Sequence, residues 1–377
     1  MALVLSDEQQ MLKESAQGFF TEFAPISEMR KLRDLDEDYS TGLWQQMVAM
    51  GWAAILVPEA YGGLGFGHVG MGQIVEQSGR KLTASPLFST AILGASMIQA
   101  AGTEGQKSSL LSAIANGDLT TALAVDESAF HAPEQIAMKA ERTSQGYCLN
   151  GVKRHVVCGH VAETLIVAAR TAGCAGDRQG ISLFLVDAGS AGVTVERVPT
   201  VDSRSIANIS FVDVELASDA VLGEPGLGYS ALASTLDIGN AHLAAELLGI
   251  ASESFDCTLQ YLKERKQFGV LIGSFQALQH RAAHWWSEIE LCKSVVLKSL
   301  QALDEGDPNA PALISISKAK LCEIAELSTN EAIQMHGGVG MTDEYDIGLY
   351  IKRARPVQAL FGDFSYHGHR FANMAGY

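Results

Sequence analysis

The stretch Gln334-Met335-His336-Gly337-Gly338-Val339-Gly340-Met341-Thr342 decides the fold of this chain, together with Glu264-Arg265-Lys266-Gln267-Phe268-Gly269 further upstream. Each stretch closes a long segment in which apolar residues recur at helical spacing. Two adjacent glycines at a helix end permit positive φ and a close approach of the backbone to another group. Taken singly, each stretch is also compatible with an ordinary capped helix end. Only the combination of the two stretches with the segments around them indicates a particular fold.

The segments around these two stretches predict long helices. Four periodic segments with short loops between them favour an antiparallel bundle, at roughly 229–266, 275–304, 308–337 and 344–375. The chain before about residue 118 is also predicted to be helical. Its first helix begins at a capping box formed by Ser6 and Gln9. Further helices are expected around 43–48, 67–80 and 86–101.

The middle of the chain has a different sequence pattern, in which short runs rich in β-forming residues alternate with turn residues. Strands are predicted near 147–149, 164–169, 181–186 and 206–212. Asn150-Gly151 lies between β-rich residues and predicts a hairpin turn. We therefore expect an α+β chain of three domains. These are an N-terminal helical domain at 1–118, an antiparallel β domain at 119–225 and a four-helix domain at 226–377.

Composition argues against several classes of protein. The formal net charge of −16 opposes binding to nucleic acid or to an anionic membrane surface. The sequence contains no run of about 18 apolar residues, so we expect no membrane span. The N-terminus lacks the pattern of a secretory signal. Six scattered cysteines without a C-x-x-C pair indicate free thiols in a reducing, cytoplasmic setting. We expect no metal site, and His367 and His369 are interpreted as solvent-facing or interface residues.

Several stretches together resemble the acyl-CoA dehydrogenase family. Besides the two stretches above, the resemblance rests on Val57–Gly65, Tyr147–Lys153 and Ala169–Thr171, so it covers essentially the whole chain. Within the family, the chain is similar to the small or partner subunits of heteromeric members, including those that act on pimeloyl-CoA and on steroid-derived acyl-CoAs.

The resemblance implies that FAD lies between the domains and reaches into a neighbouring subunit. The residues implied to bind FAD are Arg265, Phe268, Gln276, Gln334, Gly337 and Gly338. In this arrangement Arg265 pairs with the pyrophosphate, which suits the fork of donors on a guanidinium. Phe268 packs on the adenosine half, and the two glutamines donate hydrogen bonds around it. These residues would act on an FAD whose flavin ring sits in the partner subunit.

The chain departs from the family where a subunit holds its own flavin ring. A typical Thr-Glu-Pro-Gly-Ala-Gly-Ser stretch is replaced by Val125–His131, and a later Trp-Ile-Thr by His155-Val156-Val157. The glycines whose amides would face the ligand are missing. Asp126 replaces a hydroxyl and would add negative charge beside a reduced flavin, which is unfavourable.

The catalytic base of the family is also missing from its usual places. Family members remove an α-proton with a glutamate, and counting from Arg353 that glutamate falls on Gly362. The other place that the family uses corresponds to Gly239, followed by Asn240 instead of arginine. Asp363 is the one nearby acid and the candidate base. The alternative is an exposed or helix-capping aspartate.

Three readings follow from this pattern of kept and lost residues. In the first, the chain is the partner subunit of an α2β2 dehydrogenase acting on a bulky or dicarboxylic acyl-CoA, with an electron-transferring flavoprotein as electron acceptor. In the second, it is a homotetramer that uses Asp363 as its base. In the third, it is a flavin-containing lyase or a purely structural partner.

Overall fold

The computed structural model describes residues 3–377 and divides into two compact units. We call them the helical unit, Met1–Leu35, His68–Thr83 and Asn240–Tyr377, and the sheet unit, Asp36–Gly67 and Ala84–Gly239. Each unit is described by itself. The domain limits expected from the sequence remain a prediction.

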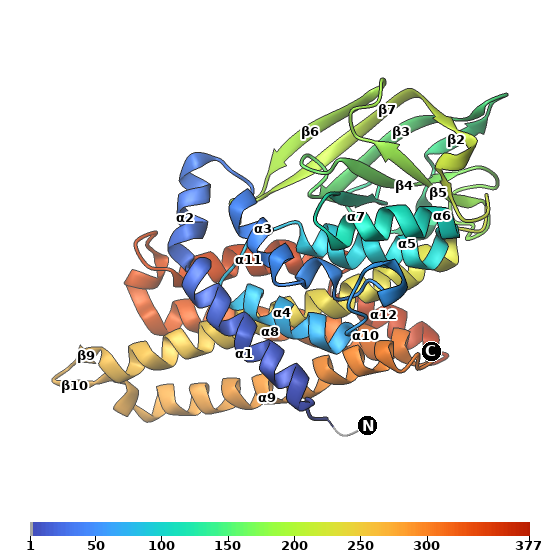
Figure 1. Ribbon diagram of the computed structural model, residues 1–377. Coiled ribbons are helices and arrows are strands. Elements are labelled where there is room, and N and C mark those ends of the chain that lie inside the picture. Colours follow the sequence, from blue (N-terminus) through green and yellow to red (C-terminus); the bar gives the residue numbers. More distant parts are fainter. Residues whose placement is uncertain (1–2) are drawn as a thin grey trace. The chain divides into compact units, whose positions relative to one another are not determined.

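The helical unit contains the long C-terminal helices that the sequence predicts (Figure 1). Its helices are α1 (Asp7–Phe23), α2 (Ile26–Leu35), α4 (His68–Arg80), α8 (Tyr229–Glu264, from Asn240 on), α9 (Gln276–Asp304), α10 (Ala310–His336), α11 (Ile347–Ala359) and α12 (Phe364–Met374). A hairpin of β9 (Lys266–Gln267) and β10 (Val270–Leu271) joins α8 to α9. Neither α2 nor a division between α11 and α12 was predicted.

Capping and small residues explain two local features of this unit. The predicted capping box is confirmed, because Ser6 Oγ accepts from the amide of Gln9 at 3.3 Å and the Gln9 side chain accepts from the amide of Ser6 at 2.9 Å. Helices α4 and α8 cross closely at glycines. A Cβ on Gly249 would lie 2.0 Å from the carbonyl oxygen of Glu76, so only glycine permits this approach.

The predicted helix at 344–375 is wrong at its centre, where a turn separates α11 from α12. Phe361 and Gly362 have φ values of +55° and +105°, and a right-handed helix cannot continue through them. The Asp363 side chain then accepts a hydrogen bond from the amide of Tyr366 at 2.9 Å and so caps α12.

The sheet unit combines short helices with one large sheet (Figure 1). The helices are α3 (Thr41–Ala49), α5 (Ala95–Ala101), α6 (Glu104–Gln106) and α7 (Ser112–Ala115), with a π-helical segment at Leu87–Gly94. The strands are β1 (Thr121–Ala124), β2 (Lys139–Arg142), β3 (Gly146–Val157), β4 (Thr164–Arg170), β5 (Ile181–Asp187), β6 (Val193–Pro199), β7 (Ser205–Ala217) and β8 (Val221–Leu222). Their order is β6-β7-β3-β2-β4-β5-β8, with β1 beside β4.

Two details of the sheet differ from the prediction. The sheet is largely antiparallel, but β1 and β2 each pair with β4 in parallel. The hairpin turn predicted at Asn150-Gly151 is wrong, because both residues lie inside β3 and Asn150 pairs with Lys139. The register against β7 shifts there instead, which marks a bulge. The turn between β2 and β3 closes at Gly146, whose carbonyl accepts from the amide of Thr143 at 3.0 Å.

Two sequence expectations concern chemistry outside the site. All six cysteines are free thiols, as predicted. Within residues 3–377, no helix has both the length and the apolar character to cross a membrane.

Candidate cofactor and substrate site

The hairpin arm, residues 265–275, carries two of the predicted FAD-binding residues. Its strands pair Lys266 with Leu271 and Gln267 with Val270. The two turn residues, Phe268 and Gly269, have φ values of +54° and +81°, as a two-residue type I′ turn requires. Asparagine and glycine favour this conformation, whereas a bulky residue in it is an outlier. The chain nevertheless displays phenylalanine there, with 91% of its surface exposed.

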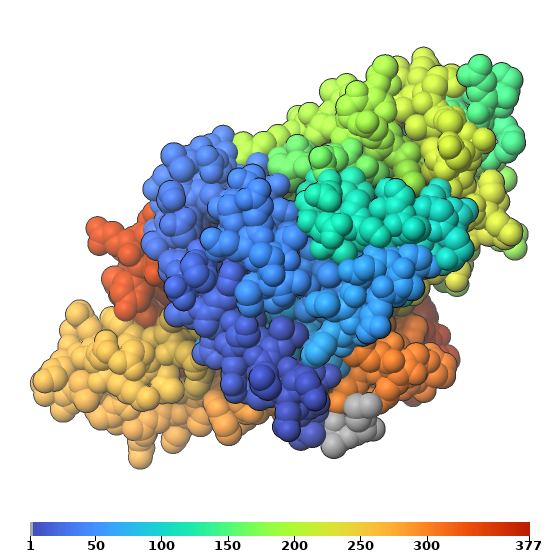
Figure 2. All heavy atoms as spheres, viewed as in Figure 1, coloured from blue at the N-terminus to red at the C-terminus, as the bar shows by residue number. Residues whose placement is uncertain are grey.

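Arg265 precedes the arm's first strand and is exposed. In the described part of the chain no carboxylate pairs with its guanidinium, so its donors are available to an external anion. Phe275 lies at the base of the arm, with its ring 6.2 Å from that of Phe268 in a T-shaped arrangement. Figure 2 shows this end of the unit at the surface, in yellow to orange. The arm thus presents aromatic and cationic groups to solvent.

The second predicted segment ends α10 at a glycine turn. Gly337 has φ +65° and ψ −141°, and its amide donates to the carbonyl of Gln334. This conformation requires glycine. Gly338 does not have a positive φ, and a Cβ placed on it would meet nothing within 4 Å. No contact within the described chain therefore requires glycine at position 338. The space beside Gly338 is open, so a group from outside the chain can approach its backbone.

The structure brings the two predicted segments together at one end of the helical unit. Leu262, Ile272 and Met335 form a small apolar cluster that joins the ends of α8 and α10 to the arm. Tyr261 stacks on His336 with ring centroids 4.3 Å apart. The six residues predicted to bind FAD thus belong to three segments that converge: Arg265 and Phe268 on the arm, Gln276 at the start of α9, and Gln334, Gly337 and Gly338 at the end of α10.

The candidate base lies elsewhere in the same unit. The turn that carries Asp363 packs on Lys318, whose ammonium donates to the carbonyl of Gly362 at 2.9 Å. Lys318 and Gln334 are 16 residues apart in α10, which is about 24 Å along the helix axis at 1.5 Å per residue. The structure therefore separates Asp363 from the predicted FAD-binding residues of its own chain.

His367, which we expected to face solvent or an interface, is buried in the helical unit. Its Nε2 lies 3.2 Å from the carbonyl oxygen of Phe361 and donates to it. His369 is exposed, in line with the prediction. Within the described residues, no group of three or more histidine, cysteine or acidic side chains is arranged to hold a metal ion.

In the sheet unit, the segment Val125–His131, which departs from the family pattern, is fixed by hydrogen bonds to the carboxylates of two of its own residues, Asp126 and Glu127. Asp126 contacts His131 Nδ1 at 2.9 Å and accepts from the amide of Ala132 at 3.2 Å. Glu127 accepts from the fully buried ammonium of Lys153 at 2.7 Å. Burial lowers the pKa of Lys153, and Glu127 opposes that shift. Sequence reasoning missed His131, which no recognised motif marks.

His155 stands where the family pattern has tryptophan, at an irregular point of β3. The register against β7 shifts between Lys153 and Val156, and His155 takes a φ of +55°. Its side chain is exposed. An imidazole offers a smaller and more polar surface than an indole, so this position provides less stacking area for a flavin ring.

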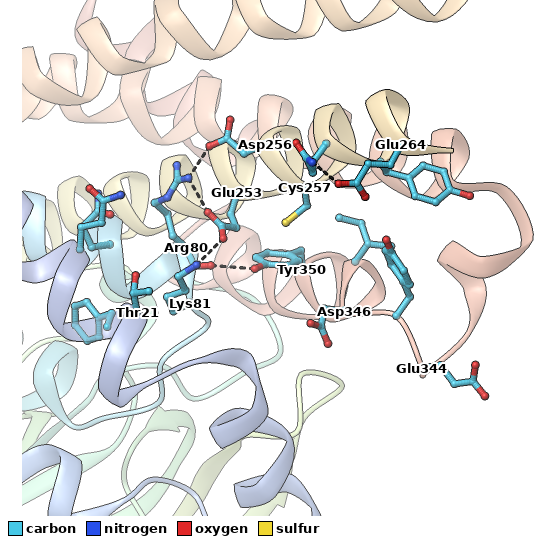
Figure 3. Close-up of a pocket in the computed structure, with 17 residues that line it drawn as sticks. Thr21, Arg80, Lys81, Glu253, Asp256, Cys257, Glu264, Glu344, Asp346 and Tyr350 are labelled. Atoms are coloured by element: carbon cyan, nitrogen blue, oxygen red, sulfur yellow. Dashed lines mark hydrogen bonds and ion pairs between the residues drawn. The ribbon is translucent and has the colours of Figure 1, made fainter. Parts of the chain in front are cut away.

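Figure 3 shows a pocket that the sequence did not predict, two of whose lining residues, Tyr261 and Tyr345, contact the ring of His336 at the end of α10. It has a volume of about 590 Å³ and is lined by residues of α1, α4, α8 and α11, including Tyr261 of α8, and by the segment before α11, including Tyr345. Arg80 joins Glu253 and Asp256 across one side, each at 2.6 Å. Burial and Glu253 raise the pKa of Cys257 in the pocket to about 11. A raised pKa favours the protonated thiol at neutral pH and so lowers its reactivity as a nucleophile.

Comparison with known proteins identifies the class. Residues 6–118, 126–214 and 226–370 match the N-terminal, middle and C-terminal domains of acyl-CoA dehydrogenases. A probable acyl-CoA dehydrogenase of Bacillus subtilis, YngJ, is 32% identical over 367 residues, covering 95% of both chains. This chain therefore belongs to the acyl-CoA dehydrogenase family and has its three-domain fold. Members of the family are FAD-dependent oxidoreductases that act on the CH–CH bond of acyl-CoA.

Solved structures are similar over essentially the whole chain. Butyryl-CoA dehydrogenase from Megasphaera elsdenii has a TM-score of 0.92 with 26% identity, and the match covers 100% of both chains. A chain from a variant of the steroid acyl-CoA dehydrogenase Tcur3481-Tcur3483 has a TM-score of 0.88 with 28% identity, covering 98% of both chains.

Proposed function

We propose that this chain is the partner subunit of a heteromeric acyl-CoA dehydrogenase and that its hairpin arm completes the FAD site of the other subunit. The observation that carries the proposal is the contrast between the two ends of the helical unit. The arm, the start of α9 and the glycine turn carry the six residues that the resemblance implies bind a neighbour's FAD. The place of the family's base is Gly362, at a φ of +105°.

The backbone at Gly362 gives a further reason, beyond the missing glutamate, why this position does not supply a catalytic base. A Cβ on Gly362 would lie 2.2 Å from Cδ1 of Tyr366, so a longer side chain does not fit this turn. Asp363, the neighbouring acid, already accepts the hydrogen bond that caps α12. Under the proposal, the carboxylate that removes the α-proton comes from the other subunit.

The residues of this chain have binding roles in the proposed complex. Arg265 supplies paired donors to the pyrophosphate, Phe268 packs on the adenosine half, and Gly337-Gly338 admit the cofactor to the backbone. Bound FAD supplies the acceptor for the hydride removed from the acyl-CoA. We further propose a bulky or dicarboxylic acyl group, an electron-transferring flavoprotein as electron acceptor and a cytoplasmic location.

Co-expression with a complete family member tests the proposal. We expect an α2β2 complex that contains one FAD for every two chains and dehydrogenates an acyl-CoA. The chain expressed alone should contain substoichiometric FAD and show no dehydrogenation. A yellow homo-oligomer with one FAD per chain and full activity would falsify the heteromer and favour the homotetramer with Asp363 as base.

A further inference from the structure

The residue that precedes the glycine turn is a buried histidine. His336 is 4% exposed, and its Nδ1 lies 2.7 Å from the carbonyl oxygen of Ala332, one helical turn back in α10. Because a carbonyl oxygen can only accept, Nδ1 carries the proton and donates. Nε2 is then an acceptor, and no group among the described residues donates to it. Burial lowers the pKa of His336, which favours the neutral imidazole.

Two tyrosine rings contact the imidazole of His336. The ring of Tyr261, from α8, stacks on it with centroids 4.3 Å apart and an interplanar angle of 26°. Tyr345, from the segment before α11, lies 5.1 Å away at 55°. The two tyrosine rings are themselves in T-shaped contact, with centroids 6.0 Å apart. Such contacts stabilise aromatic groups beyond the burial of their area, so three segments of the helical unit are joined at the end of α10.

Tyr261 also contacts the backbone that leads into the glycine turn. Its hydroxyl donates to the carbonyl oxygen of His336 at 3.4 Å. The amide of Gly337, at the other end of the same peptide unit, donates to the carbonyl of Gln334. A peptide unit is planar, so hydrogen bonds at both ends fix its orientation. The rotations at Gly337, φ +65° and ψ −141°, then set the direction of the peptide unit that follows.

The same tyrosine relates the glycine turn to the hairpin arm. Tyr261 packs against the apolar cluster that joins the ends of α8 and α10 to the arm, which consists of Leu262, Ile272 and Met335. Beside the turn, a Cβ placed on Gly338 would meet nothing within 4 Å. Tyr261 therefore contacts the supports of both predicted FAD-binding segments, on the side away from the open space at Gly338.

We propose that Tyr261 and His336 are positioning residues for the FAD of the other subunit: they keep the glycine turn in the conformation that admits the cofactor to its backbone. The inference rests on the proposed function, which assigns this turn and the arm to that FAD. Both residues act through the turn. Tyr261 fixes its first peptide unit, and the imidazole of His336 provides the surface on which Tyr261 stacks.

The test compares two substitutions that each remove one tyrosine hydroxyl, in the complex co-purified with the other subunit. Tyr261→Phe removes the donor to His336. The matched control Tyr350→Phe removes a donor to the carbonyl of Arg80, at 3.0 Å in the same pocket. In Tyr261→Phe the Kd for FAD, measured from flavin fluorescence on dilution, should rise about three- to tenfold, as expected for the loss of one hydrogen bond. Hydrogen exchange of residues 337–342 should accelerate by a similar factor. Tyr350→Phe should change neither.

Substitution of His336 tests the stacking surface in the same complex. His336→Phe keeps a flat ring between the two tyrosines, so the Kd for FAD should stay within about threefold of the unsubstituted complex. His336→Ala removes the ring and should raise this Kd about tenfold, since about 1.4 kcal/mol corresponds to a factor of ten. At saturating FAD, kcat should remain within about twofold in all these variants, because the base lies in the other subunit.

Equal Kd values for FAD in Tyr261→Phe and Tyr350→Phe overturn the inference. Faster exchange of residues 337–342 with unchanged FAD binding also overturns it, because Tyr261 would then fix a turn that does not bind the cofactor. If His336→Ala does not fold, the two tyrosine variants still decide. Failure of the proposed function is seen separately, as one FAD per chain and full activity in the unsubstituted chain alone.

Discussion

Asp363 illustrates how one side chain can be read in two ways. The sequence marks it as the acid nearest to the family's base position, and the structure shows its carboxylate capping α12. A cap needs only an acceptor, whereas a base needs an ionisable carboxylate. Asparagine caps helices as well as aspartate does, so a single substitution separates the two roles.

Asp363→Asn should leave the dehydrogenase activity of the heteromeric complex within about twofold of the unsubstituted complex, because the amide preserves the cap and the base lies in the other subunit. Asp363→Ala removes the cap and should destabilise the protein by about 1 kcal/mol. Steady-state kinetics and thermal unfolding measure the two effects. A loss of about 10²-fold or more in the asparagine variant would identify Asp363 as the base.

A buried histidine in the helical unit gives a prediction about pH. His242 is fully buried against His68, with ring centroids 5.5 Å apart. Burial and the neighbouring imidazole lower its pKa well below the ordinary value, so the folded chain keeps it neutral. Below about pH 6.5 the unfolded chain takes up a proton that the folded chain does not, and stability falls by up to about 1.4 kcal/mol per pH unit.

Substitution of His242 should therefore flatten the acid side of the stability profile. Between pH 7.5 and 5.5, the free energy of unfolding should decrease less in His242→Leu than in the unsubstituted protein. His369→Leu, at an exposed position, is the control and should follow the unsubstituted protein. Parallel profiles for all three proteins would contradict the assignment.

At the scale of elements, the sequence predicted whether a segment is a helix or a strand better than it predicted where a helix is broken. The long helices and β-rich runs follow from the spacing of apolar residues, so they were predictable. The break at 360–363 was not, since Leu360 and Phe361 continue the apolar pattern and the turn depends on a lysine more than forty residues away in α10. At Asn150-Gly151 the sequence predicted a turn that does not form. The local preference for a turn is outweighed there by pairing of β3 with β2 on one side and with β7 on the other.

The candidate site was predictable where it depends on short motifs. Arg265, Phe268 and Gly337 were chosen through the resemblance, and the structure places their segments at one end of the helical unit. The Asp126–His131 contact joins residues whose pairing no local pattern signals. The pocket beside Tyr261 is lined by residues of four helices and of the segment before α11, so no single stretch of the sequence indicates it.

The hairpin arm predicts an opposition between stability and cofactor binding. Phe268→Asn places the residue that a type I′ turn prefers at φ +54°. It should raise the stability of the isolated chain by up to about 1 kcal/mol, because the penalty of a left-handed phenylalanine is relieved. It should also weaken FAD retention in the complex, because the aromatic surface on the adenosine is lost.

Thermal unfolding of the isolated chain and flavin released on dilution of the complex measure the two effects. The control Tyr377→Asn removes another exposed aromatic side chain, far along the sequence, and should change neither. Unaltered flavin retention in Phe268→Asn would contradict the assignment of Phe268 to the cofactor.

At the scale of the whole molecule, the charge of the chain affects how copies associate. Each copy carries a formal net charge of −16, so two copies repel each other at long range. The Debye length falls from about 10 Å at 0.1 M salt to about 3 Å at 1 M. Any self-association of the isolated chain should therefore strengthen as salt rises. Sedimentation at 0.05 and 0.5 M salt measures this, and dissociation at higher salt would be the contrary result.

The exposed arm also links thermal stability to concentration. Most of the surface of Phe268 at the tip of the arm is exposed, so burying it requires another molecule. Whatever binds the folded form shifts unfolding by mass action. If the arm binds a partner as proposed, the melting temperature should rise with the concentration of that partner, and a dilute preparation of the chain alone should unfold at a lower temperature.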